Sequence, residues 1–473
     1  MLTLDPLLAL PTVLPFGARY FCSIFEYHLR KLSPVIDMYS SIWHQSCTMP
    51  SFPTVHGDLK TDVLIIGGGM AGILTAWYLK QSGVDCLVLE ADTIGGGVTA
   101  NTTAKITSQH CLIYSRLLQS IGHERAKAYW QAHEHAIEKY RLLSQRYPCD
   151  LENRDHFVYS LDDPARLEGE LEALSRLGIP SDFSSELPIP MPTAGAVRFF
   201  AQAQFHPLKL ISGLAAELNI REHSRVLSLE KGKAITEHGL IRADKIVVAT
   251  HFPILNRRGL YFMKQYQSRS YVLALAGAQQ LPGMYLDGSG EGLSFRNYGE
   301  YLLLGGGAHR TGKPSPGWIP LTSFASAHYP GCREEARWAA QDCMTLDSVP
   351  YIGRYSPGTP WLYVATGFNK WGMTGSMTAA QILSRMVCGE ASPWQDVFDP
   401  ARSIWKKQLA VNMAESAVHF LRPRGPRCPH LGCRLEWNRM EHSWDCPCHG
   451  SRFDANGNIL EDPAVRNMKK DRL

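Results

Sequence analysis

The chain has 473 residues, of which 45% are hydrophobic and 19% are charged. This composition excludes disordered and fibrous classes, and the length predicts two or three domains. The formal net charge of +4 is spread along the chain, so nucleic acid is not an expected partner. Most of the 12 cysteines are scattered without regular spacing, which is typical of a cytoplasmic protein.

The N-terminal residues do not have the pattern of a membrane anchor. The apolar run from Leu2 to Phe25 is interrupted by acidic, basic and proline residues, and no basic region precedes it. We interpret residues 1–40 as an N-terminal extension, or as the result of a translation start placed upstream, for which Met38 is an alternative. No later stretch resembles a transmembrane helix, so we expect a cytoplasmic protein without an integral membrane span.

The first predicted strand leads into a nucleotide-binding fingerprint. Asp62–Ile66 is a short apolar run suited to a buried parallel strand, and a helix is predicted over Ile73–Gln81. The turn between them has the pattern G-x-G-x-x-G. In this pattern Gly67 permits the tight turn, Gly69 lets the backbone approach a pyrophosphate, and Gly72 lets helix and strand pack closely.

A second predicted strand completes this fingerprint. Cys86–Leu89 ends at Glu90, whose carboxylate is placed to accept hydrogen bonds from the hydroxyls of an adenosine ribose. The helix N-terminus binds phosphate through free N–H groups and through its dipole. The two strands, the turn and the acid together favour a dinucleotide site over a structural turn.

Further glycine-rich passages favour FAD over a nicotinamide cofactor. A second loop, Gly95–Lys105, is rich in glycine and threonine, and a strand-to-loop passage follows at Lys245–Thr250. A third passage, Trp361–Gly375, opens a helix whose N-terminus would stabilise negative charge on a reduced flavin. Contacts spread over this length of chain suit an extended FAD. The alternative is that the second loop is only a polar turn and its Lys105 only a surface charge.

Two Cys/His pairs near the C-terminus have the spacing of an iron–sulfur site. Cys428 and His430 form Cys-x-His, and Cys446 and His449 form Cys-x-x-His. Two thiolates on one iron and two imidazoles on the other are the ligands of a Rieske [2Fe-2S] cluster. Zinc is the alternative, but structural zinc sites prefer C-x(2–4)-C and H-x(3–5)-H spacings. The pattern therefore predicts one-electron transfer.

Residues from about Ser41 to Arg385 resemble the D-amino-acid oxidase-like (glycine/D-amino acid oxidase) family of FAD-dependent oxidoreductases. The stretches that carry the resemblance are Val63–Glu90, Thr99–His110, Trp338–Asp342, Asp347–Arg354 and Ala365–Gly375. The members that look most similar are bacterial proteins with a C-terminal Rieske domain. By this resemblance FAD would contact Gly67, Gly69, Ala71, Gly72, Glu90, Thr102, Thr103, Lys105, Val226, Thr250, Gly367, Phe368, Trp371, Gly372 and Met373.

The resemblance implies a fold of the α/β and α+β classes. A Rossmann-type FAD-binding domain with an inserted mixed-sheet substrate domain would be followed by a small all-β Rieske domain. The substrate domain would come from segments at about 150–200 and 260–335. In chain order we expect an extension over 1–40, the FAD-dependent oxidoreductase over 41–395, a linker helix over 396–423 and the Rieske domain over 424–473.

The resemblance also implies roles around the cluster. Cys433 and Cys448 occupy the positions where Rieske proteins of respiratory complexes carry a disulfide, and they are predicted to pair. Ser451 would donate a hydrogen bond toward a cluster sulfur and raise the potential. Asp462 departs from the family, in which a glycine is usual at this position. An acid there would lower the potential or loosen the loop that covers the cluster.

We therefore expect an FAD-dependent oxidoreductase with an iron–sulfur cluster. A small organic donor, such as an amine or amino acid, would reduce FAD, and the electrons would pass singly to the [2Fe-2S] cluster and on to an external carrier. Two alternatives stay open. One is an oxygen-using oxidase whose cluster is structural or a redox switch, and the other is a non-enzymatic electron-transfer or redox-sensing module. No motif identifies a catalytic base, so the sequence leaves the catalytic residues unknown.

Overall fold

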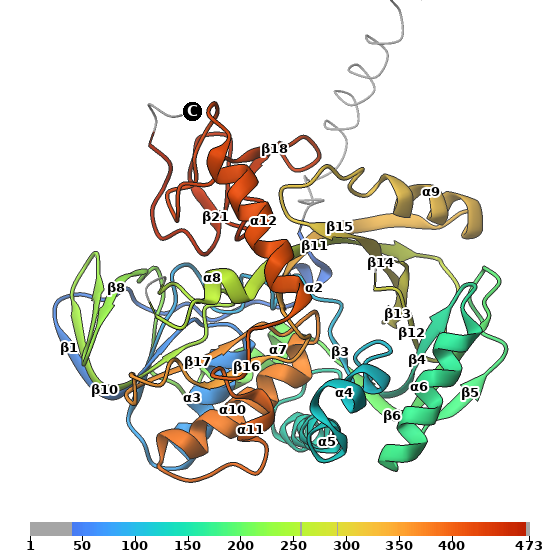
Figure 1. The fold of residues 1–473 in the computed structure, drawn as a ribbon, viewed down its shortest axis with the longest axis horizontal. Helices are drawn as coiled ribbons and strands as arrows, with labels where there is room; N and C mark the ends of the chain where they lie inside the picture. Colours follow the sequence, from blue (N-terminus) through green and yellow to red (C-terminus); the bar gives the residue numbers. More distant parts are fainter. Residues whose placement is uncertain (1–39, 256–257, 291, 470–473) are drawn as a thin grey trace, which may run out of the picture.

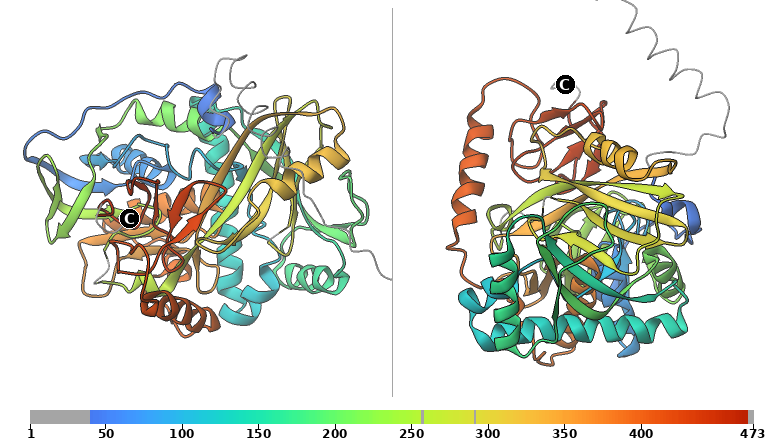
Figure 2. Two further views of the ribbon diagram at one scale, coloured as in Figure 1. Left: turned by 90° about the horizontal axis from the view of Figure 1, so that it is seen from above. Right: turned by 90° about the vertical axis from the view of Figure 1, so that its right-hand side faces the viewer.

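The computed structural model describes residues 40–255, 258–290 and 292–469 (Figure 1). Almost all of the expected N-terminal extension lies outside these residues. The described chain builds a largely parallel sheet, a larger mixed sheet and a small antiparallel sheet near the C-terminus. Figure 2 shows that the small sheet and helix α12 (Lys407–Leu421) sit against the body formed by the other two sheets.

The parallel sheet is built from short apolar strands that are buried on both faces. β1 (Leu59–Ile66) lies between β2 (Cys86–Leu89) and β10 (Leu240–Val248) and pairs with both in parallel. Helices α3 (Met70–Gln81) and α10 (Gly372–Val387) pack together on one face of it. The remaining strands are β7 (Ile220–Arg221), β17 (Leu362–Thr366), the antiparallel edge strand β16 (Tyr351–Arg354), and the hairpin of β8 (Val226–Glu230) and β9 (Lys233–Thr236).

The mixed sheet carries the segments inserted between the nucleotide-binding strands. Its strand order is β15-β11-β14-β13-β12-β4-β6-β3, with β5 beside β6, and only the β12–β4 pairing is parallel among its described strands. The strands are β3 (Lys105–Ile106), β4 (Glu152–Ser160), β5 (Asp182–Ser184), β6 (Gly195–Gln204), β11 (Gln265–Ala276), β12 (Met284–Asp287), β13 (Ser294–Tyr298), β14 (Tyr301–Arg310) and β15 (Arg333–Thr345). The chain enters this sheet when it passes from β2 to β3, and it leaves the sheet for the last time when it passes from β15 to β16.

The other helices surround the two large sheets. α5 turns its buried Tyr129 and Tyr140 into the core that also contains α10. α6 begins where the Asp163 carboxylate accepts the Arg166 N–H over 3.0 Å, an N-cap, and ends at Gly178. These helices are α2 (Ile42–Ser46), α4 (Tyr114–Ile121), α5 (His123–Arg146), α6 (Pro164–Leu177), α7 (Pro207–Ala215), α8 (Tyr261–Lys264), α9 (Ile319–His328) and α11 (Gln395–Phe398).

The C-terminal domain has its own small apolar core. Its antiparallel sheet runs β18 (Glu436–Asn438), β19 (Ser443–Asp445), β20 (Arg452–Phe453) and β21 (Ile459–Glu461) in order. The core consists largely of cysteines, with Leu435 and Phe453. The predicted fold class is confirmed by this arrangement of sheets and helices. Of the helices in the described residues, none combines the length and apolarity needed to cross a bilayer.

Candidate functional site

A cavity of about 310 Å³ runs between the parallel sheet, the mixed sheet and the C-terminal domain. Most of the residues expected at FAD border it: Gly67, Gly69, Ala71, Glu90, Thr102, Thr103, Lys105, Val226, Thr250, Phe368, Trp371, Gly372 and Met373. Gly72 and Gly367 are the expected residues that do not line its wall. The cavity thus collects side chains from distant parts of the chain along one extended path, as an elongated dinucleotide requires.

The glycine-rich turn leaves no space for side chains at its closest points. A Cβ atom at Gly72 would collide with the carbonyl oxygen of Gly67, and one at Gly67 would collide with that of Ala249. Gly67 also has a φ of +111°, which side chains rarely tolerate. Gly69 is the N-cap of α3, so the free N–H groups of that helix begin at the cavity wall. This local geometry fits a pyrophosphate.

Glu90 ends β2 at the same wall and is held by the backbone. Its Oε2 accepts the N–H of Gly68 over 2.7 Å, and its Oε1 accepts that of Asp92 over 2.9 Å. Burial raises the pKa of the Glu90 carboxyl, these two hydrogen bonds oppose the rise, and the nearby acid Asp462 adds to it. The carboxylate is therefore fixed in orientation beside the cavity, as a ribose-binding acid must be.

The C-terminal domain closes this end of the cavity. Asp462 and Val465 line the wall together with Ser224 and Arg225. Arg225 donates from Nη1 to Oδ1 of Asp462 over 2.9 Å, and each side chain is a little over a quarter exposed. Asp462, which departs from the family pattern, therefore has an ion-pair partner in the structure. An acid at this position ties the loop that is expected to cover the cluster to Arg225, beside the expected adenosine site.

Lys105 also lines the cavity and is buried on β3. Its Nζ donates to the hydroxyl of Ser294, and burial, reinforced by the charge of Arg296, lowers the pKa of Lys105 to about 7. Arg296 donates from Nη1 to the carbonyls of Thr103 and Ala104 over 2.7 and 2.8 Å, which fixes the loop before the lysine. The Lys105 ammonium is thus only weakly favoured at neutral pH and lies where the flavin is expected.

A partly buried acid lines the cavity beside Lys370. Asp342, on β15, lines the cavity near Lys370, and burial raises its pKa to about 6 although the lysine opposes the rise. Lys370 lines the cavity as well, and its Nζ donates to the carbonyl of Gly290 over 3.0 Å. A carboxyl that titrates near neutral pH beside a cofactor cavity is suited to proton transfer.

His110 is buried, and its two ring nitrogens both have partners within the protein. Its Nδ1 and the Tyr129 hydroxyl lie 2.6 Å apart, and its Nε2 is 2.8 Å from the carbonyl of Thr107. Burial lowers the pKa of His110 to about 3, so the ring is neutral at physiological pH. The ring stacks on Trp371 with a centroid separation of 4.8 Å and thereby orients an indole that borders the cavity.

The four predicted cluster ligands come from two loops of the same construction. In the first loop Gly432 donates its N–H to the carbonyl of Cys428, and in the second Gly450 donates to Cys446, each over 2.9 Å. The imidazoles of His430 and His449 lie with ring centroids 5.0 Å apart. Hydrogen bonds, led by that of the Cys428 thiol, hold the pKa of Cys446 well below its usual value.

These residues fit a Rieske cluster. Cys428 and Cys446 are buried, and both ring nitrogens of the buried His449 have no hydrogen-bond partner among the described residues. Buried polar atoms of this kind are expected to be satisfied, and a metal ion would satisfy them. Ser451 lies against the Cys428 thiol and accepts the N–H of Ala464 over 3.0 Å, so it joins the first loop to the covering loop.

The expected disulfide between Cys433 and Cys448 is not formed in the structure. Both are free and buried, and their sulfur atoms lie within 4.8 Å of each other and of the Cys446 sulfur. Each of the three thiols contacts the other two, so the sulfur atoms of Cys433 and Cys448 are neighbours that are not bonded. Oxidation of this pair in the loaded protein stays a prediction.

The cluster loops face the flavin-binding part of the molecule. Phe252 is fully buried, and its ring centroid lies 6.3 Å from those of both His430 and His449. Phe262 lies 6.1 Å from His449 by the same measure. The two residues before Phe252, Thr250 and His251, line the cavity. Three consecutive residues thus connect the cavity wall to the histidine edge of the cluster site.

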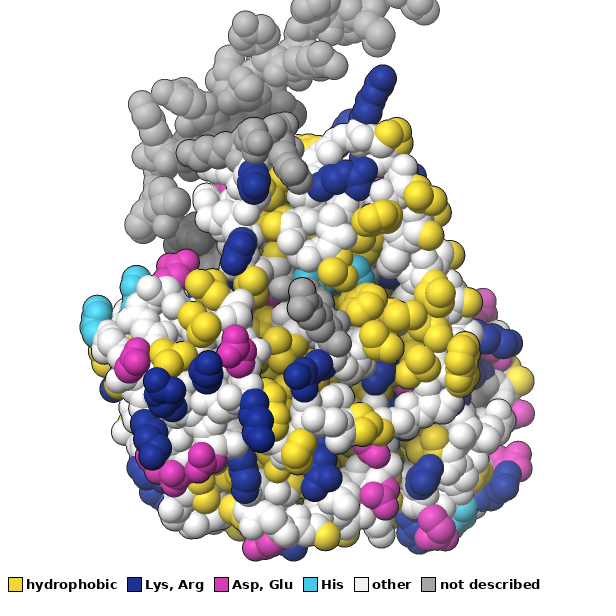
Figure 3. All heavy atoms as spheres, turned by 60° about the vertical axis from the view of Figure 1, so that its left-hand side comes forward, with side chains coloured by type: hydrophobic (Ala, Val, Ile, Leu, Met, Phe, Trp, Pro, Cys, Tyr) yellow, Lys and Arg dark blue, Asp and Glu magenta, His cyan; other side chains and the backbone are white. Residues whose placement is uncertain are grey.

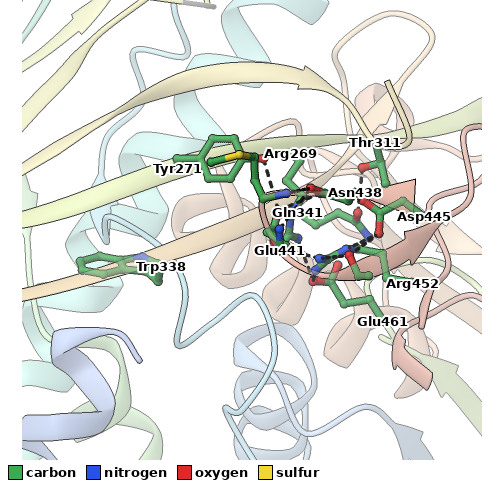
Figure 4. A network of polar contacts seen from close by, with 12 residues as sticks. Arg269, Tyr271, Thr311, Trp338, Gln341, Asn438, Glu441, Asp445, Arg452 and Glu461 are labelled. Carbon is green, nitrogen blue, oxygen red and sulfur yellow. Dashed lines mark hydrogen bonds and ion pairs between the residues drawn. The ribbon is translucent and has the colours of Figure 1, made fainter. Parts of the chain in front are cut away.

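Polar contacts fix this interface (Figure 4). Arg269, on β11, donates to both carboxylate oxygens of Glu441 and, over 2.9 Å, to Glu461. Arg452 of the C-terminal domain contacts the same two acids and also Asp445. Burial disfavours the charged form of Glu441, but Arg269 and Arg452 outweigh it and hold the pKa at about 2. The interface is therefore a paired, buried ionic network.

Comparisons with known proteins agree with both halves of this site. The family model described as FAD dependent oxidoreductase matches residues 62–386, and the Rieske [2Fe-2S] domain model matches residues 397–470. Among curated proteins, "Putative Rieske 2Fe-2S iron-sulfur protein YhfW" of Bacillus subtilis is 32% identical, over 94% of this chain and 98% of that protein. Gamma-glutamylputrescine oxidoreductase of Escherichia coli is 22% identical, over 72% and 86% respectively.

Solved structures share the fold of the larger part. Glycine oxidase from Geobacillus kaustophilus has a TM-score of 0.63 and 18% identity, covering 73% of this chain and 99% of its own. L-proline dehydrogenase from P. horikoshii has a TM-score of 0.61 and 17% identity, covering 74% and 98%.

Proposed function

The chain belongs to the family of FAD-dependent oxidoreductases and carries a Rieske [2Fe-2S] domain, and we propose that it oxidises a small amine or amino acid and delivers the electrons singly through its cluster. Bound FAD supplies two-electron chemistry, and a Rieske cluster supplies one-electron transfer. An external one-electron carrier would take the electrons in two successive steps. The names of similar proteins, glycine oxidase and L-proline dehydrogenase, support an amino acid as donor.

The contact between Phe252 and the two cluster histidines is the observation that carries this proposal. His251 lines the FAD cavity, and the next side chain in sequence touches both imidazoles of the cluster site. Phe252 is fully buried, so water does not separate the two sites at this point. A cluster that served only as a remote structural element would not need its histidine edge against the cofactor cavity.

Residues at the flavin end fit the demands of amine oxidation. An amine must be neutral before the adjacent C–H bond can yield a hydride, so a proton acceptor is required near the flavin. Asp342 borders the cavity with a pKa of about 6 and is therefore ionised at neutral pH. Lys370 supplies positive charge at the same end, which suits a donor carboxylate, and the buried amine of Lys105 supplies a hydrogen-bond donor there. We assign Asp342 as proton acceptor and the two lysines as positioning residues.

Anaerobic rapid mixing of the holoprotein with a panel of amines, amino acids and reduced nicotinamides tests the proposal. A donor is expected to bleach the flavin band, followed by the electron paramagnetic resonance signal of a reduced Rieske cluster. Bleaching with a cluster that stays oxidised would favour the oxygen-using oxidase. Reduction by protein carriers alone, with no response to the panel, would favour the non-enzymatic electron-transfer module.

A further inference from the structure

Helix α12 presents its apolar side to solvent. The exposed residues between Lys407 and Arg422 are Ala410, Val411, Met413, Ala414, Ala417, Val418, Phe420 and Leu421. Val411, Met413, Val418 and Phe420 are each about half exposed, and Leu421 is 75% exposed. In Figure 3 hydrophobic side chains gather on the right-hand side of the face in view, where α12 runs. An apolar surface of this extent on a helix marks an interaction site.

The polar residues of α12 face the protein and hold the helix in this orientation. Asn412 is buried and accepts from Nη1 of Arg310 over 3.0 Å, and its own amide donates to the carbonyl of Met263. Glu415 pairs with Lys313 over 2.8 Å. Rotation of the helix to bury its apolar face would break these contacts. The outward apolar face, defined by the exposed residues above, is therefore a built feature of the fold.

Basic residues stand at both ends of this apolar face. Lys406 and Lys407 precede it, and Arg424 follows it together with Arg422, which is paired with Glu436 over 2.7 Å. Trp405, beside the first pair, is 83% exposed. A helix with apolar and aromatic residues on one side and cations at its margins is the pattern of an interfacial helix, which lies in the surface of an anionic bilayer.

We propose that the apolar face of α12 docks the protein peripherally on an anionic lipid surface. Docking would bring the cluster close to the membrane, because Phe420 of the apolar face lies next to the first cluster loop. A Cβ atom built on Gly432 of that loop would lie 3.7 Å from the Phe420 ring. Docking on lipid does not depend on the electron route proposed above. It would place the first cluster loop beside carriers that dissolve in the bilayer.

Two other occupants fit the charges less well. In a symmetric pair of α12 helices the cations of one copy would meet those of the other, whether the helices ran parallel or antiparallel, and like charges repel. Transient redox interfaces between proteins are small and about as apolar as the rest of a protein surface. A continuous apolar face with cations at both ends matches an anionic bilayer better than either.

Flotation of the full holoprotein with lipid vesicles tests this proposal. Binding to phosphatidylglycerol/phosphatidylcholine vesicles is expected, with little binding to pure phosphatidylcholine and a loss of binding at high salt. The double substitution Val411→Glu/Val418→Glu is expected to weaken binding at least tenfold. Lys407→Glu should weaken it by roughly fivefold or more. Ile319→Glu, which changes an apolar residue of similar exposure on α9, is the matched control and should bind as the wild type does.

Flavin absorbance and visible circular dichroism of the cluster establish that each variant is folded and loaded. Equal binding to neutral and anionic vesicles, or unchanged binding of the double variant, would overturn the proposal. Two further results would also overturn it. One is that the wild-type protein is a dimer in solution and that the same double substitution dissociates it. The other is that Val418 can be cross-linked to residues 1–39 of its own chain and that the cross-linked protein does not bind vesicles.

Discussion

The Arg225 guanidinium and the Asp462 carboxylate lie 2.9 Å apart and join the C-terminal domain to the part of the cavity where the adenosine of FAD is expected. Because Asp462 and Val465 line the cavity, the Rieske domain contributes to the wall of the expected FAD site. Binding of FAD and docking of the Rieske domain are therefore expected to favour each other, since a ligand stabilises the arrangement that completes its site.

Arg225→Ala is expected to release FAD several times faster than the wild type does. The substitution leaves the Asp462 carboxylate unpaired near Glu90 and near the expected pyrophosphate, where like charges repel. The rise in fluorescence of released FAD measures the rate. Arg225→Ala/Asp462→Ala removes both charges and should recover part of the loss. Arg221→Ala, at an arginine of β7 that does not line the cavity, is the control, and equal release by Arg225→Ala would contradict the coupling.

Phe252→Leu is expected to slow electron transfer from flavin to cluster by severalfold while both cofactors stay bound. The shorter side chain loses contact with the histidine rings and costs less stability than an alanine would. Transient absorbance of the two cofactors measures the rate. Phe295→Leu changes an equally buried phenylalanine that does not line the cavity and should leave the rate unchanged. An unchanged rate of electron transfer in Phe252→Leu would show that this residue is not part of the electron-transfer path.

Cys428→Ser and Cys446→Ser are expected to lose the cluster and to destabilise the C-terminal domain, whose apolar core is small. Iron and inorganic sulfide analysis measures the first effect, and limited proteolysis measures the second. Cys86→Ser, at a buried cysteine of β2, should keep both iron and sulfide. One zinc with no sulfide in the wild-type protein would show that the site is a zinc site.

The stability of the interface is expected to fall as the pH drops from about 4.5 toward 2. The pKa of Glu441 is about 2 in the folded protein and 4.5 without its partners. Between these values the unfolded chain binds the proton and the folded one does not, so acid favours unfolding. The total effect is on the order of 3 kcal/mol.

Thermal unfolding followed through visible circular dichroism of the cluster measures this dependence. Glu441→Gln should be less stable at pH 7, because Arg269 and Arg452 lose a partner, and its stability should vary less with pH. Glu230→Gln, at an exposed pair, should behave as the wild type. Parallel pH profiles for Glu441→Gln and the wild type would contradict the assignment.

Flavin reduction by the amine or amino acid donor is expected to accelerate as the pH rises through about 6. Burial raises the pKa of Asp342 to about this value, and only the carboxylate can accept the proton of a donor ammonium. Asp342→Asn should lose this part of the profile and reduce the flavin slowly at all pH values. If the rate of flavin reduction in Asp342→Asn still rises near pH 6, another residue is the proton acceptor.

Local motifs made the cofactor sites predictable. The turn from Gly67 to Gly72, the acid at Glu90 and the Cys/His pairs each lie within a short stretch whose spacing reflects the chemistry. Helix α3 begins at Met70, earlier than the predicted Ile73, because the last residues of the fingerprint turn are already helical.

The relationship between the two domains could not be predicted in this way. Arg225 and Asp462 are 237 residues apart in sequence, and Arg269 and Glu441 are 172 apart. Such pairs depend on how two independently patterned domains dock, and no period or spacing encodes that. Among these four residues, the sequence singled out Asp462 alone, because it departs from the family pattern. Nothing in the sequence singled out Phe252, since a single buried phenylalanine is ordinary in a core.

Flash photolysis of the anaerobic holoprotein can show directly whether electrons pass from flavin to cluster within one chain. A 5-deazariboflavin radical delivers single electrons, and absorbance at separate wavelengths follows flavin and cluster. We expect a phase in which reduced flavin is reoxidised while the cluster is reduced, at a rate independent of protein concentration. Cofactors that change only in phases whose rates scale with protein concentration would contradict electron transfer within one chain.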